Sequence, residues 1–113
     1  GFLFGAALAL QLRLPLHIVR KAGKLPGETI SVDYDLEYGT DRLEAHRGVF
    51  LPGARFAIVD DVLATGGTAA AAAELVRREG GTVACAAFLL ELGFLAGRER
   101  LAPVIVESVI RYE

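Results

Sequence analysis

The sequence is poor in several residue types, and each shortage narrows the class of protein that it can encode. Cys85 is the single cysteine among 113 residues, so no internal disulfide can form. The apolar residues near the start are interrupted at Gln11 and Arg13, well short of the about 20 that a membrane span needs. His17 and His46 have no metal-ligand spacing with each other or with Cys85. We therefore expect no disulfide framework, no transmembrane helix and no protein-built metal site.

An excess of charge of either sign is also missing. The formal net charge is only −2, which gives no support for binding to nucleic acid or to a membrane surface. Hydrophobic residues make up 53% of the chain, and 113 residues are enough for one core but not for two. We therefore predict one domain over residues 1–113, in a soluble cytoplasmic enzyme.

Methionine is absent altogether, including from position 1. The first ten residues are almost wholly apolar, and no helix-capping residue precedes them. A secretory signal peptide would need a basic segment and a clear cleavage site, which this stretch lacks. We therefore expect the chain to be truncated at its N-terminus.

Strand and helix patterns alternate along the chain, which favours an α/β fold with a mainly parallel sheet flanked by helices. Val83 to Leu90 is a continuous apolar run typical of a buried parallel strand, and Gly80-Gly81 ends a helix before it. Residues 30–34 alternate between apolar and polar, which favours a half-exposed strand. The other predictions are helices over 2–12, 69–79 and 95–101, strands over 16–20, 43–47, 55–59 and 104–110, a loop over 21–29, and turns at 39–41 and 52–53.

Residues 56–68 (FAIVDDVLATGGT) carry the strongest functional signal. A strand is expected to end in Asp60 and Asp61, and a loop of small and hydroxyl residues then leads into a helix. The unpaired amides of a first helical turn and the helix dipole favour an anion, and Gly66 and Gly67 let the backbone curl around it. Two carboxylates beside an anion site suit a ligand that also carries hydroxyl groups or a divalent cation, as a ribose phosphate would. Ligands of open α/β sheets bind at this end of the strands.

The same run resembles the phosphoribosyl pyrophosphate (PRPP) signature of the type I phosphoribosyltransferases, through Val59-Asp60-Asp61 and Ala64-Thr65-Gly66-Gly67-Thr68. It is neither a Walker loop nor the spaced-glycine dinucleotide fingerprint. Other segments are similar to the adenine phosphoribosyltransferase family in particular. They are residues 1–5 (GFLFG), 20–27 (RKAGKLPG), 34–39 (YDLEYG) and 97–101 (GRERL), and the resemblance covers the whole chain.

The resemblance implies a type I phosphoribosyltransferase fold and a purine-salvage reaction. Adenine would attack C1 of PRPP to give AMP and pyrophosphate, with Mg²⁺ bound mainly through PRPP. Asp60 and Asp61 would accept hydrogen bonds from the ribose hydroxyls and stabilise the positive charge that grows on the ribose ring. The 5′-phosphate would be held by Ala64, Thr65, Gly66, Gly67 and Thr68.

Glu37, Tyr38 and Leu92 take their roles from the resemblance as well. Glu37 would be the acidic residue over the reaction centre, and Tyr38 lies beside it in what resembles the family's mobile active-site hairpin. Leu92 would be an apolar wall for the purine ring. Without the resemblance, these positions would be interpreted as a solvated hairpin tip and a core leucine.

Three cations, Arg20, Lys21 and Lys24, fall close together just past a predicted strand end. They form either an ordinary basic loop or the group that receives the leaving pyrophosphate, and their density favours the second interpretation. The resemblance also implies a homodimer.

The sequence departs from the family at its front. The N-terminal hood that contacts adenine, the first strand and the first half of the pyrophosphate loop are missing, so we expect this piece to bind PRPP poorly and to turn over little. Two alternatives stay open: a phosphoribosyltransferase for xanthine or hypoxanthine, and a non-catalytic PRPP-binding regulatory domain. The segments 36–39 and 98–101 favour adenine, and Glu37 argues against the regulator.

Overall fold

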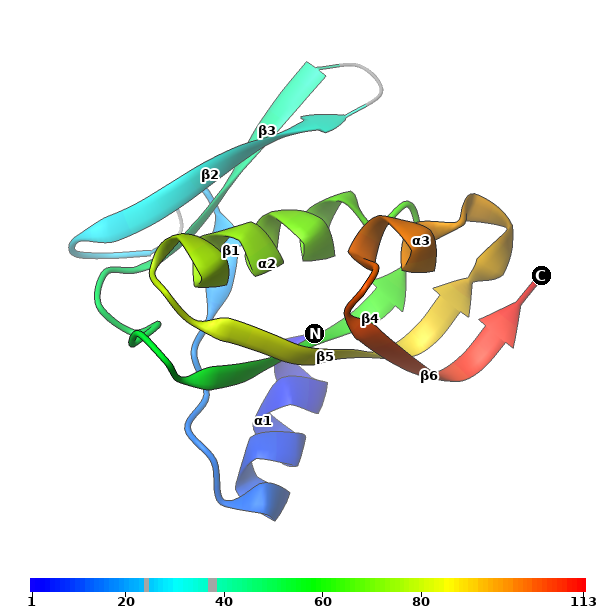
Figure 1. The fold of residues 1–113 in the computed structure, drawn as a ribbon, viewed down its shortest axis with the longest axis horizontal. Helices are drawn as coiled ribbons and strands as arrows, with labels where there is room; N and C mark the ends of the chain where they lie inside the picture. Colours follow the sequence, from blue (N-terminus) through cyan, green and yellow to red (C-terminus); the bar gives the residue numbers. More distant parts are fainter. Residues whose placement is uncertain (24, 37–38) are drawn as a thin grey trace.

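The computed structural model describes residues 1–23, 25–36 and 39–113, and its six strands form two separate sheets (Figure 1). The antiparallel sheet has the order β1-β3-β2 and consists of β1 (Val19–Lys21), β2 (Thr29–Leu36) and β3 (Gly39–His46). The parallel sheet has the order β4-β5-β6 and consists of β4 (Arg55–Leu63), β5 (Thr82–Leu92) and β6 (Ile105–Tyr112). The helical elements are α1 (Phe2–Leu12), α2 (Gly67–Arg78), the 3₁₀ turn η1 (Gly93–Leu95) and α3 (Gly97–Leu101).

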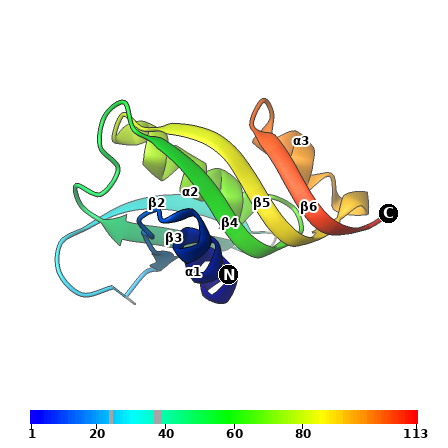
Figure 2. The same cartoon turned by 90° about the horizontal axis from the view of Figure 1, so that it is seen from below.

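The elements stack in layers. Helix α2 connects β4 to β5 and lies between the parallel sheet and the β2–β3 hairpin, while α1 packs against β4 on the other face of the parallel sheet (Figures 1 and 2). The predicted α/β fold with helices on both sides of a parallel sheet is therefore confirmed. Three of the six strands, however, belong to the second, antiparallel sheet.

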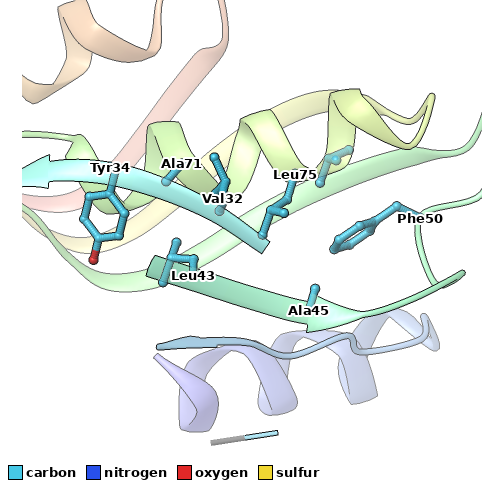
Figure 3. Packing of buried hydrophobic residues seen from close by; sticks show 9 residues of the cluster. Val32, Tyr34, Leu43, Ala45, Phe50, Ala71 and Leu75 are labelled. Carbon is cyan, nitrogen blue, oxygen red and sulfur yellow. The ribbon is translucent and has the colours of Figure 1, made fainter. Parts of the chain in front are cut away.

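The alanine-rich sequence of α2 follows from its place between two layers. Ala71 and Leu75 pack against Val32 and Leu43 of the hairpin, in a cluster that Figure 3 shows from close by. Ala69 instead packs with a second cluster over the parallel sheet. A helix with buried positions on both sides needs small side chains, because its neighbours approach it from two directions. The members of the second cluster are Leu63, Ala69, Ala86, Phe88, Leu101 and Val106.

Several predicted boundaries were wrong. The central strand does not end before the carboxylates: β4 continues to Leu63, because Asp60, Val62 and Leu63 pair with β5. The turn predicted at 39–41 is strand, because Gly39 already pairs with Leu36 in the hairpin. The strand predicted over 16–20 is β1, which begins only at Val19 where pairing with β3 starts. Helix α2 begins at Gly67 rather than at residue 69.

Helix α1 exposes much of its apolar surface. Leu3 is 86% exposed and Leu10 is 82% exposed, while Gly5 is the buried residue of this helix. An exposed apolar face of this kind is typical of a surface that packs against another protein segment. Within the described residues, no helix has both the length and the hydrophobicity to cross a membrane.

Candidate active site

The loop between β4 and α2 is held in a conformation that requires glycine. Gly66 precedes the helix with φ +86°, in the left-handed region that side chains rarely adopt. A Cβ at Gly66 would also lie only 2.7 Å from the carbonyl oxygen of Gly97. This close backbone contact fixes the path of the loop at the point where it enters the helix.

The N-terminus of α2 is suited to an anion. No side chain caps it among the described residues, and its first turn contains no acidic residue. The backbone amides there point along the helix axis and carry the positive end of the helix dipole. The basic residues Arg77 and Arg78 lie in the last turn, where they complement the opposite end of the dipole. The first turn of α2 therefore presents an uncompensated positive end, as a phosphate site does.

A small pocket of about 90 Å³ lies at this loop. Its walls come from the carboxyl end of β4, the loop, the start of α2 and one aromatic residue of β5. The lining residues are Asp60, Val62, Leu63, Ala64, Thr65, Gly66, Gly67, Thr68, Ala69 and Phe88. The structure thus brings Asp60 together with all five residues predicted to hold the phosphate.

The two adjacent carboxylates differ in their environment. The Asp60 side chain is 38% exposed and that of Asp61 is 54% exposed. Partial burial raises the pKa of Asp60, whereas the hydrogen bond with the Asp60 side chain lowers the pKa of Asp61. Each carboxylate accepts a hydrogen bond from the next backbone amide, at 2.8 Å for Asp61 N and 2.9 Å for Val62 N. Both retain exposed oxygens that a ligand hydroxyl can reach.

The start of α1 lies beside these carboxylates. The backbone nitrogen of Gly1 is 3.7 Å from Asp60 Oδ1 and 3.9 Å from Asp61 Oδ2. Asp60 therefore lies close both to Gly1 and to the loop before α2.

The predicted pyrophosphate cations lie on the other sheet. Arg20 and Lys21 are both strand residues of β1, so Lys21 belongs to the strand and not to the loop predicted over 21–29. Lys21 Nζ lies 3.3 Å from Asp41 Oδ2, and the Arg20 guanidinium lies 5.1 Å from the ring centroid of Phe2. Lys24 lies outside the described residues.

The remaining predicted residues are distributed between the two sheets. Glu37 and Tyr38 lie outside the described residues, between the ends of β2 and β3. Leu92 is the last residue of β5 and pairs with Tyr112 of β6. It is partly buried, at the same end of the parallel sheet as the carboxylates and the loop.

Sequence reasoning missed four residues around the loop. A Cβ at Gly67 would lie 3.8 Å from both Arg100 Nη1 and Tyr34 Cδ2, so α3 and β2 both reach the start of α2. Glu91, which is buried, forms an ion pair with Arg98, whose side chain is 42% exposed. In the sequence, Glu91 is a charged residue that directly follows the apolar run 83–90. No local pattern indicates that Arg98 is its partner.

Metal binding by the protein alone finds little support in this region. The described part of the chain has no group of three or more His, Cys, Asp or Glu side chains that could hold a metal ion. Asp60 and Asp61 do offer carboxylate oxygens, which are the ligands that Mg²⁺ prefers. The residues present therefore fit an ion that takes most of its ligands from a bound phosphate compound and from water.

Comparisons with known proteins agree with this geometry. The sequence profile of the phosphoribosyl transferase domain matches residues 1–107. The adenine phosphoribosyltransferase of Roseiflexus sp. (strain RS-1) is 55% identical over 112 residues, which cover 99% of this chain and 65% of that protein. The adenine phosphoribosyltransferase of Rubrobacter xylanophilus is 58% identical over 113 residues, which cover 99% of this chain and 61% of that protein.

The same likeness extends to solved structures. The crystal structure of adenine phosphoribosyltransferase from Thermoanaerobacter pseudethanolicus matches with a TM-score of 0.96 at 54% identity, over 99% of this chain and 65% of that chain. The chain thus spans somewhat less than two thirds of the length of these relatives. The predicted type I phosphoribosyltransferase fold is confirmed, and the chain belongs to the phosphoribosyl transferase domain family.

Proposed function

We propose that this protein transfers the 5-phosphoribosyl group of PRPP to adenine, giving AMP and pyrophosphate in purine salvage. Relatives named adenine phosphoribosyltransferase at 53–60% identity support this assignment. A structure of the Trypanosoma brucei enzyme in complex with AMP, pyrophosphate and ribose-5-phosphate matches this chain with a TM-score of 0.88. The observation that carries the proposal is the pocket that joins Asp60 to the loop at the start of α2.

The loop would bind the end of the substrate that does not react. Amides and hydroxyl groups of residues 64–68 would hold the 5′-phosphate at the N-terminus of α2. Binding energy from this remote group positions C1 of the ribose for displacement. The role requires a rigid loop, which the close backbone contact between Gly66 and Gly97 supports.

The carboxylates would act nearer to the reacting carbon. A ring nitrogen of adenine attacks C1, the bond from C1 to the pyrophosphate oxygen breaks, and the electron pair of that bond leaves with pyrophosphate. The proton on the attacking nitrogen is released to water or to the departing pyrophosphate. Positive charge grows on the ribose ring during this step. Asp60 and Asp61 would accept hydrogen bonds from the ribose hydroxyls, and their negative charge stabilises the ring as its positive charge develops.

Other residues would complete the site around the attacking base and the leaving pyrophosphate. Glu37 and Tyr38 would cover the reaction centre from the hairpin and exclude water. Leu92 would pack against the purine ring. The leaving pyrophosphate would be received by Arg20, Lys21 and Lys24. Lys21 would then exchange its contact with Asp41 for a contact with the leaving group.

Mg²⁺ would be held mainly through PRPP oxygens, with Asp60 and Asp61 as the nearby carboxylates. When bound, the ion neutralises charge on the pyrophosphate that leaves.

We further infer that the protein is a cytoplasmic homodimer. The apolar side chains exposed on α1 fit an interface with a second copy of the chain. The free cysteine Cys85 is compatible with a reducing compartment.

The test is a product assay on the protein as its gene encodes it. Purified protein is incubated with PRPP, Mg²⁺ and one base at a time: adenine, hypoxanthine or xanthine. We expect AMP from adenine and little nucleotide from the other bases, measured by chromatography. Nucleotide formed mainly from hypoxanthine or xanthine would instead assign a different base. Binding of PRPP without any nucleotide product would point to a regulatory domain.

A further inference from the structure

Helix α3 packs directly against the loop at the start of α2. A Cβ at Gly97 would collide with the carbonyl oxygen of Ala64 and would lie 2.9 Å from Leu63 Cδ1 and 3.1 Å from the backbone nitrogen of Gly66. The approach is reciprocal, because a Cβ at Gly66 would meet the backbone of Gly97. The loop therefore rests on the first residue of α3, backbone against backbone.

The residue after this contact, Arg98, is anchored to the buried carboxylate of Glu91, and its own side chain is 42% exposed. Arg98 donates from Nη2 to Glu91 Oε1 at 2.7 Å and from Nε to Glu91 Oε2 at 3.1 Å. It also donates from Nη1 to the carbonyl oxygen of Val106 at 2.8 Å. Ser108 Oγ lies 2.8 Å from Glu91 Oε1 and donates a third hydrogen bond to the same carboxylate. A two-point contact between guanidinium and carboxylate fixes the direction as well as the distance of the arginine.

Glu91 also lies next to the start of the loop, because its strand β5 pairs with the end of β4. In the parallel sheet Glu91 pairs with Leu63, the residue that directly precedes Ala64. Glu91 is only 1% exposed, and the hydrogen bonds from Arg98 lower the pKa of its carboxyl to about 2. The carboxylate is therefore ionised across the physiological pH range.

We propose that Glu91, Arg98 and Ser108 are positioning residues for the phosphate-binding loop: they hold Gly97 against Ala64 and Gly66 and so set the loop's geometry for a phosphate monoester. The proposal rests on the proposed function only in taking residues 64–68 as the site of the 5′-phosphate. None of the three residues lines the pocket at the loop, so they act through Gly97.

The two-point geometry of the ion pair indicates a positioning role beyond a contribution to stability. Removing the Glu91 carboxylate from water costs desolvation energy, and an arginine that is itself 42% exposed returns only part of that cost through its charge. What the pair supplies here is a fixed orientation for the start of a five-residue helix whose other end is held by the buried Leu101.

The test compares phosphate binding among matched variants of the full gene product. Glu91→Gln removes the charge with little change in shape, and Ser108→Ala removes one hydrogen bond of the cluster. Ser108→Thr keeps the hydroxyl group and serves as the rescue variant. Glu74→Gln is the matched control, because it breaks a glutamate–arginine pair with Arg78 that is exposed on the surface. Calorimetric titration measures the Kd of ribose 5-phosphate, and steady-state kinetics give kcat and the KM values for PRPP and adenine.

We expect Glu91→Gln to weaken ribose 5-phosphate binding by about tenfold and Ser108→Ala by about threefold, because small displacements of binding groups weaken a fitted site strongly. The KM for PRPP should rise in parallel, with little change in kcat or in the KM for adenine. This is the pattern expected when a substitution weakens the binding of the substrate and of the transition state equally. Ser108→Thr and Glu74→Gln should leave the Kd of ribose 5-phosphate within about twofold of the wild-type value.

An unchanged Kd in folded Ser108→Ala and Glu91→Gln protein would overturn the proposal, even if melting temperatures fell. If Glu91→Gln does not fold, Ser108→Ala against Ser108→Thr decides the matter. Failure of the proposed function is seen separately. A wild-type protein that binds ribose 5-phosphate but makes no AMP refutes adenine transfer and leaves the binding comparison intact.

Discussion

Two acidic sites lie near the same end of the parallel sheet, and they are built in opposite ways. Asp60 and Asp61 are partly exposed and adjacent, and their pKa values are moved in opposite directions. Glu91 on the next strand is buried, and Arg98 and Ser108 satisfy its carboxylate. Asp60 pairs with Phe88, three residues before Glu91, so the two sites are neighbours in one sheet.

The difference indicates which carboxylates are available to a ligand. A carboxylate that already accepts hydrogen bonds from an arginine and a serine has little capacity left, and its removal from water forbids exchange with a substrate. Exposed carboxylates with unfilled oxygens keep that capacity. We therefore assign binding and charge stabilisation to the aspartates and support of the loop to the glutamate.

The largest effect is expected from Asp61→Asn. The amide keeps the shape of the side chain but loses its negative charge, so kcat should fall by roughly two to three orders of magnitude, as when a group that stabilises transition-state charge is removed. The unfolding free energy should change by less than about 0.5 kcal/mol, because the side chain is 54% exposed. Product assays and urea denaturation measure the two quantities. A stability loss as large as the activity loss would contradict the assignment.

The second prediction is the reverse of the first, with a clear loss of stability and little loss of activity. Glu91→Gln should lower the unfolding free energy by about 2 kcal/mol, because it weakens the charge-assisted hydrogen bonds that Arg98 and Ser108 donate to a buried carboxylate, while the Arg98 side chain is itself 42% exposed. Because the phosphate site weakens but the aspartates remain, kcat at saturating PRPP should stay within about threefold of the wild type. Urea unfolding and saturation kinetics on the same preparation provide the comparison. A Glu91→Gln protein as stable as the wild type would contradict the assignment of a supporting role to Glu91 and of a ligand-binding role to the aspartates.

The third prediction concerns the stability of the protein at low pH. The pKa of Glu91 lies at about 2 in the folded protein, below its ordinary 4.5, because Arg98 and Ser108 donate hydrogen bonds to the ionised form. Its contribution to stability is therefore fully present above pH 4.5 and is lost as the pH falls toward 2. The stability difference between the wild type and Glu91→Gln should shrink over that range, as followed by urea midpoints at several pH values. A difference that is independent of pH would mean that the carboxylate's charge is not the stabilising feature.

The sequence was sufficient to predict the acidic residues that lie in one continuous segment. The strand, the loop and the helix of residues 55–78 follow each other without interruption, so the local pattern placed Asp60 beside the loop. The predicted strand ended too early because aspartate is a poor strand former, and only pairing with β5 carries β4 on to Leu63. Strand ends depend on partners that local propensity does not reveal.

Glu91 could not be assigned in the same way. Its hydrogen-bond partners come from α3 and from β6. The backbone contact between α3 and the loop joins Gly97 to Ala64, which are more than thirty positions apart in the sequence. Such a site is defined by topology, because adjacent parallel strands and a short helix bring the three segments together only after folding. A single charged residue at the end of an apolar run was visible, but its satisfaction by Arg98 was not.

The smallest effect is expected at an exposed pair of the same chemistry. Glu74 and Arg78 lie one turn apart on α2, with Arg78 Nη2 2.9 Å from Glu74 Oε1, and both side chains are about half exposed. Water already solvates both charges, so Glu74→Gln should change the unfolding free energy by less than about 0.5 kcal/mol and leave kcat and KM unaltered. The same substitution chemistry would then produce a roughly fourfold or larger difference in stability loss between positions 74 and 91. If thermal and urea unfolding instead gave similar losses at both positions, burial would not be what separates a supporting carboxylate from a solvated one. The assignment of Glu91 to the loop would then need a cause other than its enclosure.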